Sequence, residues 1–156
     1  MALPLSSNRA VRERATVPDE ISGEHLEKLR NVLKSVPFAQ LLGIELVAAT
    51  LGTATLRLEI RSNLTQNYGV LHGGAMAALI DTATAFAIVS QLSRPEKFTT
   101  VDLSINYLRP LMEGAATCQA RVIRAGRRLL TISAEVHDDA GNLAAIALST
   151  YIRLAS

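Results

Sequence analysis

Cysteine, tryptophan and dense positive charge are what this sequence has least of. Its 156 residues include one cysteine, no tryptophan and 4% aromatic residues, and the formal net charge is only +2. The single cysteine, Cys118, excludes an internal disulfide framework and fits a reducing compartment, so we expect a cytoplasmic protein. No dense Lys/Arg run is interleaved with aromatic residues, which argues against nucleic acid as a partner. Cys118 alternates with Ala120 and Val122, which predicts a thiol packed in the core.

The sequence shows no clear secretory signal or membrane span, and an Arg-rich transit peptide is the alternative that Arg9, Arg12 and Arg14 leave open for the N-terminal residues. Met1–Ser7 is too short an apolar run for a secretory signal, and we expect residues 1–20 to form a disordered tail. Residues 21–156 then suffice for a single domain with a sizeable core. The long apolar run Ala75–Leu92 carries Asp81 and several hydroxyl side chains, and no basic cluster flanks it. We interpret it as a helix buried in protein, hydrophobic nearly all round, and expect no membrane partner.

Hydrophobic periodicity outlines the remaining elements. Apolar residues recur at helical spacing from Leu26 to Val36, after Ser22 as a candidate N-cap and before Pro37. Alternating or short apolar runs predict six strands: Ile44–Thr50, Ala54–Arg61, Val101–Tyr107, Ala116–Arg124, Leu129–His137 and Leu143–Leu154. In the third strand, one face is predicted to carry Val101, Leu103, Ile105 and Tyr107, and the other Asp102, Ser104 and Asn106.

Turn-like segments connect the last three predicted strands. Ala125-Gly126-Arg127 and residues 138–142 are typical of hairpins, which indicates a mainly antiparallel sheet. One long helix that is apolar on nearly all sides needs a sheet curled about it. The predicted fold class is therefore α+β, with a curved antiparallel sheet of about six strands wrapped around a long central helix.

The residues best suited to catalysis lie at the start of that predicted helix and within it. Gly73-Gly74 opens the helix and leaves free N–H groups at its positive end, which suits a developing negative charge. Asp81 is the one charged side chain of the apolar run, and a buried carboxylate needs a partner or a task. Together they suggest hydrolysis or acyl transfer. Each of these residues also has a structural interpretation. His72 could be a turn residue, and the two glycines could allow tight packing. Asp81 could be a buried carboxylate bonded to Thr84 or to a neighbouring helix.

The spacing of His72 and Asp81 constrains any shared site. Nine residues are 2.5 helical turns and a rise of about 13.5 Å, so the two side chains point to opposite sides of one helix. They could meet if two copies paired with their central helices side by side and antiparallel. A two-fold dimer creates two equivalent sites of this kind. If the motif is catalytic, the enzyme should therefore be an obligate dimer or a higher assembly of dimers.

The run Gly69-Val70-Leu71-His72-Gly73-Gly74, followed by Asp81, resembles hotdog-fold acyl-CoA thioesterases. The most similar branches are the PaaI-type and the 4-hydroxybenzoyl-CoA thioesterase-like proteins, and the resemblance covers about residues 37–154. It implies hydrolysis of an acyl-CoA thioester to free acid and coenzyme A in a homodimer or homotetramer. It implies no metal and no cofactor, since coenzyme A is part of the substrate. The motif does not identify the acyl group.

The resemblance also implies roles for single residues. Asp81 looks like the catalytic carboxylate, acting as general base or as nucleophile. Gly73, through its N–H, resembles the group that polarises the thioester carbonyl, and Gly74 beside it is expected to contact the substrate. His72 resembles a residue that lines the same pocket. Thr100 matches a position whose hydroxyl orients the attacking water.

Further polar residues are implied as contacts to the substrate. Gln66 is the favoured polar contact, with Asn67 as the fallback. The family places coenzyme A phosphates near strand or hairpin ends such as Arg109, Arg127 and Arg128, often from neighbouring subunits. Ordinary solvated arginines are the alternative for these three.

Two other functions share this fold. One is a non-catalytic acyl-CoA-binding domain, which the presence of Asp81 disfavours. The other is a hotdog-type enoyl-thioester hydratase, which the lack of a second histidine near the central helix disfavours. Release of the free thiol separates the thioesterase from both.

Overall fold

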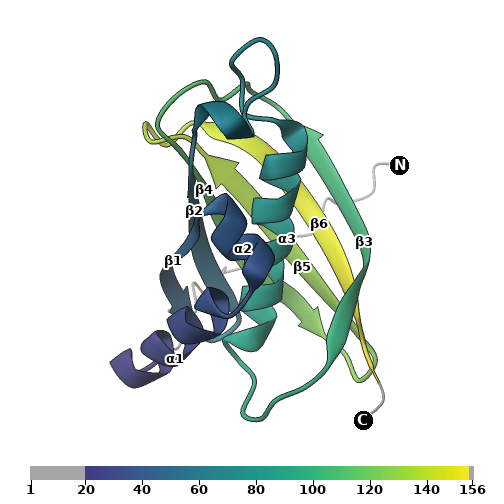
Figure 1. Cartoon of the computed structure of the whole chain (residues 1–156). Coiled ribbons are helices and arrows are strands. Elements are labelled where there is room, and N and C mark those ends of the chain that lie inside the picture. The colour runs from purple at the N-terminus through teal and green to yellow at the C-terminus, as the bar shows by residue number, and fades with distance from the viewer. Residues whose placement is uncertain (1–19, 155–156) are drawn as a thin grey trace, which may run out of the picture.

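A computed structural model describes residues 20–154, and Figure 1 shows a curved sheet against which one long helix packs. The six strands are antiparallel neighbours in the order β1-β2-β4-β5-β6-β3. The helices and strands are α1 (Gly23–Lys34), α2 (Pro37–Leu42), β1 (Ile44–Thr50), β2 (Thr53–Glu59), α3 (Gly73–Val89), β3 (Phe98–Tyr107), β4 (Ala115–Ala125), β5 (Leu129–His137) and β6 (Leu143–Arg153). The predicted α+β class, with about six strands around a central helix, is confirmed. The predicted disordered tail falls, apart from residue 20, outside the described residues.

The first two helices lie beside the β1 edge of the sheet in Figure 1. Ser22 caps α1 as predicted, because its hydroxyl accepts a hydrogen bond of 3.2 Å from the His25 N–H. The sequence pattern did not predict α2. Pro37 was expected only to follow the end of a helix, whereas proline is also favoured at the first position of one. Here Pro37 starts α2, and Gly43 ends it with a positive φ of 72°.

Most of the surface of the central helix α3 is buried, as predicted, but Ala77, Asp81 and Ala85 are only half-buried and follow one another along one face. It begins two residues before the apolar run and ends at Val89, and Leu79, Ile80 and Ala83 are fully buried. Among residues 20–154, no helix combines the length and the apolar character that crossing a membrane requires. Cys118 faces this core from β4, and its burial raises the pKa of the thiol to about 12. The prediction of a core cysteine is therefore confirmed.

A β-bulge corrects the predicted faces of β3. The ladder to β6 passes from the pair Thr100–Tyr151 directly to Asp102–Thr150, so Val101 is the extra residue. Val101 is 54% exposed and does not share a face with Leu103, so the prediction for Val101 was wrong. The same extra residue shifts the phase of the alternation. As a result, Thr100 turns inward toward α3 together with Leu103 instead of outward.

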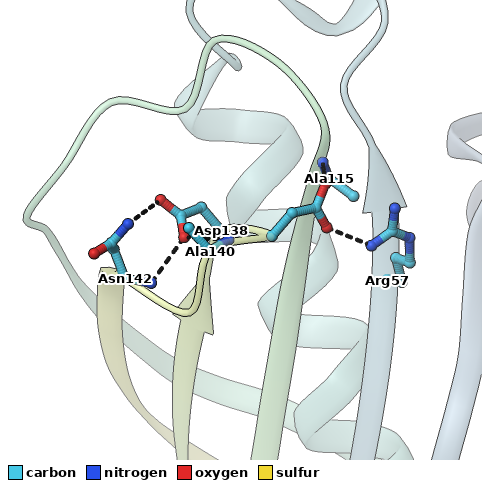
Figure 2. Close-up of polar contacts among 6 residues, drawn as sticks. Arg57, Ala115, Asp138, Ala140 and Asn142 are labelled. Carbon is cyan, nitrogen blue, oxygen red and sulfur yellow. Dashed lines mark hydrogen bonds and ion pairs between the residues drawn. The ribbon is translucent and has the colours of Figure 1, made fainter.

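The turn between β5 and β6 is held by an aspartate (Figure 2). The Asp138 carboxylate accepts hydrogen bonds from the main-chain N–H groups of Ala140 and Asn142, at 3.0 and 2.7 Å. Its second oxygen accepts the side-chain amide of Asn142 at 2.8 Å. That side-chain hydrogen bond is the largest of several contacts that lower the pKa of Asp138. The predicted hairpin is thus closed by its own first residue.

The next carboxylate fastens this turn to the rest of the sheet. One oxygen of Asp139 lies 2.6 Å from a guanidinium nitrogen of Arg57 on β2. The other accepts the N–H of Ala115, where β4 begins, at 3.0 Å. Gly114 precedes it with a φ of +72°, and a Cβ there would lie only 2.4 Å from the Asp139 oxygen. The contact therefore depends on a glycine at position 114.

Candidate active site

The Asp81 carboxylate lies in the third turn of α3 and meets two hydroxyl groups from the sheet. The Thr100 hydroxyl on β3 donates to its Oδ1 at 2.8 Å, and the Tyr151 hydroxyl on β6 lies 3.1 Å from the same oxygen. Thr100 and Tyr151 are direct partners in the β3–β6 ladder, so one register brings both to Asp81. Asp81 is half-buried, and no described residue donates a hydrogen bond to Oδ2. One carboxylate oxygen is thus held and the other is free.

Tyr151 is a residue of this cluster that was not predicted from the sequence. It is only 2% exposed, and its hydroxyl lies 2.8 Å from both the Thr84 hydroxyl and the main-chain oxygen of Asp81. Burial, as the largest cause, raises its pKa to about 12, so it stays protonated near neutral pH. The sequence signal was a tyrosine among inward-facing small residues of β6, because a buried phenol needs a partner.

Thr84 does not bond to the Asp81 side chain. Its hydroxyl donates to the main-chain carbonyl of Asp81 at 3.0 Å, one turn earlier in the helix, and it is fully buried. The structural alternative of a carboxylate bonded to Thr84 is therefore not what the chain forms. The carboxylate faces the strands instead.

The start of α3 has one capped N–H and one free N–H. His72 is the N-cap, and its Nδ1 accepts the N–H of Gly74 at 2.9 Å. The N–H of Gly73 meets no acceptor among the described residues. The Tyr107 hydroxyl donates to the Gly73 carbonyl at 2.9 Å and lies over this turn. An oxygen atom of a ligand could therefore bind at Gly73.

The two glycines differ in what they tolerate. A Cβ at Gly74 would lie 3.0 Å from Nδ1 of His72, which would disturb the cap. A Cβ at Gly73 would meet only the Tyr107 ring at 3.5 Å, an ordinary van der Waals contact. A side chain at position 74 would therefore crowd the histidine cap, whereas position 73 has room for a small side chain.

Open hollows lie on both sides of this helix start. One, of about 330 Å³, is lined by Gly73, Tyr107 and Arg109 among others. The second, of about 240 Å³, is lined by His72 and Gly74 together with the side chain of Phe38. The start of α3 is thus accessible from two directions.

The structure does not join the helix start to Asp81 within one chain. Gly73 and Asp81 are eight residues apart on α3, which is about 12 Å along the axis. Gln66 and Asn67 are exposed in the loop before the helix, and neither side chain hydrogen-bonds to another described residue. The roles of these two residues therefore stay predictions.

The three candidate arginines lie at opposite ends of the molecule. Arg109 lines the hollow at the start of α3. Arg127 and Arg128 line an open groove of about 1140 Å³ beyond the other end of the helix. This terminal groove is formed by residues 94–97, residues 125–128, Arg153 and Leu154. Arg109 and the other two arginines of one chain therefore cannot bind the same phosphate.

The cations of the terminal groove are mostly unpaired. Arg153 forms an ion pair with Glu96, and its Nε donates to the Gly126 carbonyl at 3.3 Å. No described carboxylate pairs with the remaining four cations, Arg94, Lys97, Arg127 and Arg128. The groove therefore suits a ligand with several negative charges. Within residues 20–154, no three His, Cys, Asp or Glu side chains gather as metal ligands do.

Comparisons with known proteins bear on the family and on the fold. Residues 68–145 match the family described as the Thioesterase superfamily. A Saccharolobus solfataricus protein named as an esterase is 32% identical over 127 residues, 81% of this chain and 84% of that protein. The medium/long-chain acyl-CoA thioesterase YigI of Escherichia coli is 29% identical over 132 residues, 75% of this chain and 85% of YigI. The structure of Escherichia coli PaaI, covering 88% of this chain and 98% of that one, gives a TM-score of 0.79 at 22% identity, which bears on the fold alone.

Proposed function

The chain belongs to the thioesterase superfamily and has its hotdog fold, and we propose that it hydrolyses acyl-CoA thioesters to a free acid and coenzyme A. Family membership supports thioester hydrolysis in general. The similarity to an acyl-CoA thioesterase supports coenzyme A as the leaving group. The observation that carries the proposal is a pair of unsatisfied groups, Oδ2 of Asp81 and the N–H of Gly73.

The two groups suit the two demands of the reaction. Oδ2 of Asp81 takes a proton from water as its oxygen attacks the thioester carbonyl carbon. The carbonyl oxygen gains negative charge, which the Gly73 N–H and the positive end of α3 stabilise. The C–S bond then breaks, and the coenzyme A thiolate leaves and takes up the proton held by Asp81, which regenerates the carboxylate. The Thr100 oxygen, whose hydrogen points to Asp81, can still accept a hydrogen bond from the attacking water.

This reaction needs two copies of the chain. Among the described strands, β3 is a sheet edge that pairs only with β6, and its Val101 and Tyr107 are 54% and 52% exposed. An open edge with exposed apolar side chains is a surface on which a second copy can dock. We propose a homodimer in which the α3 helices run antiparallel, so that Asp81 faces the partner's helix start. Two such dimers would form the homotetramer.

The terminal groove is our proposed site for the coenzyme A phosphates. Arg127 and Arg128, with Arg94 and Lys97, supply four cations without carboxylate partners. Lys97 precedes Thr100 by three residues, about 10 Å of extended strand. Because Thr100 contacts Asp81, a phosphate bound at Lys97 would lie well away from the Asp81 carboxylate. Reversing the charge at Arg127 and Arg128 should raise KM for acyl-CoA at low salt, and an unchanged KM would remove both from the site.

The first experiment measures free coenzyme A released from short, medium, long and aromatic acyl-CoAs. Wild type and Asp81→Asn are compared, since the amide oxygen can still accept from Thr100 but cannot take a proton. Turnover by the wild type that collapses in a folded variant supports the proposal and ranks the acyl groups. Binding without any release would instead favour the acyl-CoA-binding domain, and hydration of an enoyl-CoA would favour the hydratase.

Replacing Gly73 with proline would remove the N–H of this residue and change little else. Proline is favoured at the first position of a helix, and His72 already has the extended backbone that precedes proline. We expect Gly73→Pro to lower kcat by about a hundredfold or more, as loss of an oxyanion donor does. Gly73→Ala is the matched control, because it keeps the N–H and its Cβ fits against Tyr107. Equal activity of the two variants would exclude Gly73 as the donor.

Mixed dimers test whether the site is shared. Asp81→Asn and Gly73→Pro homodimers should both have strongly reduced activity. A mixed dimer contains one site in which Asp81 of the Gly73→Pro subunit faces the intact Gly73 of the other. Mixing should therefore restore part of the activity. Full activity in a verified monomer, or no recovery in verified mixed dimers, would contradict the shared site.

A further inference from the structure

The hydroxyl cluster around Asp81 contains a residue for which the reaction above has no role. Tyr151 approaches Asp81 from β6, on the side of the carboxylate already held by Thr100. We propose that Tyr151 is a positioning residue, which together with Thr100 fixes Oδ1 of Asp81 and leaves Oδ2 as the reacting oxygen. The proposal rests on the proposed function and deepens it.

The hydrogen bonds of the cluster give the tyrosine a bridging geometry. Its hydroxyl lies 2.8 Å from the main-chain oxygen of Asp81 and 3.1 Å from Oδ1, so a single O–H spans the backbone and side chain of one residue. The Thr84 hydroxyl, 2.8 Å from the phenol oxygen and 3.0 Å from that carbonyl, completes the cluster. The bridge restricts rotation of the Asp81 side chain relative to α3.

The phenol itself is held rigidly. Tyr151 is 2% exposed and packs edge-on against Phe98, with ring centroids 5.6 Å apart and an interplanar angle of 75°. In the ladders its neighbours are Thr100 on β3 and Leu130 on β5. The sheet thus fixes the ring, and hydrogen bonds to Thr84 and to the Asp81 carbonyl tie its hydroxyl to α3.

The consequence is that the two oxygens of Asp81 are not equivalent. Both sheet hydroxyls contact Oδ1, and Oδ2 receives no hydrogen bond from the described residues. A freely rotating carboxylate would present either oxygen and lose orientation in the transition state. A carboxylate fixed by neighbouring packed groups keeps its reacting atom in place.

The test is Tyr151→Phe, which keeps the ring and its packing and removes only the hydroxyl. Thr84 can still donate to the Asp81 carbonyl, so no buried donor is orphaned. We expect kcat to fall about tenfold, as for a lost hydrogen bond to a charged group, with KM within about twofold. Thr100→Val should act in the same direction. Thr99→Val, on the exposed face next to it, is the matched control and should leave kcat unchanged.

Two further readouts separate positioning from a structural role. In an Asp81→Asn background, adding Tyr151→Phe should change the residual rate by less than about twofold, because the tyrosine acts through the carboxylate. The ¹³C carboxyl signal of Asp81, assigned by its absence in Asp81→Asn, should shift in Tyr151→Phe. An unchanged signal with unchanged kcat, or an equal tenfold loss in both backgrounds, would overturn the proposal. A wild type that cleaves no acyl-CoA overturns the proposed function instead, and the carboxyl signal still reports on the contact.

Discussion

The β5–β6 turn and the middle of α3 both depend on aspartates, and they use them differently. At the turn, every carboxylate oxygen of Asp138 and Asp139 has a hydrogen-bonding partner. In α3, both contacts to Asp81 fall on one oxygen, and the other has no partner among the described residues. Carboxylates whose oxygens are all bonded fix the chain path. A carboxylate bonded on one side only leaves its other oxygen available to water or to a substrate.

The largest expected effect is a loss of activity on changing Asp81, and it tests whether Asp81 differs from the aspartates of the turn. Asp81→Asn should lower kcat/KM about a thousandfold, within the range for a lost general base, while the free energy of unfolding changes by less than about 1 kcal/mol. The amide oxygen still accepts from Thr100, which is why stability is retained. Parallel measurement of kcat/KM and urea unfolding checks both. A large loss of stability would make Asp81 a structural carboxylate like those of the turn.

At the turn, the largest effect should be on stability. Gly114→Ala places a side chain at φ +72° and within 2.4 Å of an Asp139 oxygen. Strain and the displaced carboxylate should together cost about 2–4 kcal/mol, and the folded fraction should keep its kcat within about twofold. Gly141→Ala is the matched control, since that glycine also has a positive φ but nothing lies near its Cβ. Equal losses would mean that backbone strain alone matters.

The two contacts of Asp139 should contribute unequally to stability, with effects smaller than that of Gly114→Ala. Asp139→Ala leaves the N–H of fully buried Ala115 without its acceptor, which should cost about 1–3 kcal/mol of unfolding free energy. Arg57→Gln removes only the ion pair, which is partly exposed, and should cost less than about 1 kcal/mol. Chemical unfolding of both variants gives the difference. A larger loss for Arg57→Gln would show that the ion pair, not the capped N–H, fixes the turn.

The smallest effect is a pH dependence at Asp138. Its pKa is lowered from an ordinary value of 3.8, so its contribution to stability is present above that pH. The contribution is lost as the pH falls through the lower, folded-state pKa. Asp138→Asn should therefore be slightly less stable than wild type near neutrality, and the gap should close on acidification. Urea midpoints from about pH 6 to about pH 2.5 measure it, and a gap that stays constant would contradict the assignment.

The architecture was predictable because its signal repeats over many residues. The strand bounds Ile44–Thr50 and Leu129–His137 match the prediction, and most of the apolar helix is buried as expected. The helix α2 was not predicted because six residues show too little periodicity. In addition, a proline can either follow the end of a helix or begin one. Short elements depend on tertiary contacts that no local pattern reports.

The sequence drew attention to Asp81, Gly73 and Thr100, but not to how the threonine reaches the carboxylate. Counting by two from Leu103 puts Thr100 on the opposite face, and only the bulge at Val101 reverses it. A bulge arises from pairing with β6, which residue spacing along β3 does not encode. Tyr151 was overlooked for the same reason, since its partner lies 70 positions away in the chain.

The order of strands in the sheet decides when the cluster around Asp81 can form during synthesis of the chain. Asp81 and Thr100 are 19 positions apart, but β3 has no described neighbour except β6, whose Tyr151 is a further 51 positions along the chain. A ribosome adding about 5–20 residues each second finishes β3 seconds before β6 exists. Until then the edge that orients Thr100 has nothing to pair with. The complete cluster therefore cannot form until synthesis has passed Tyr151.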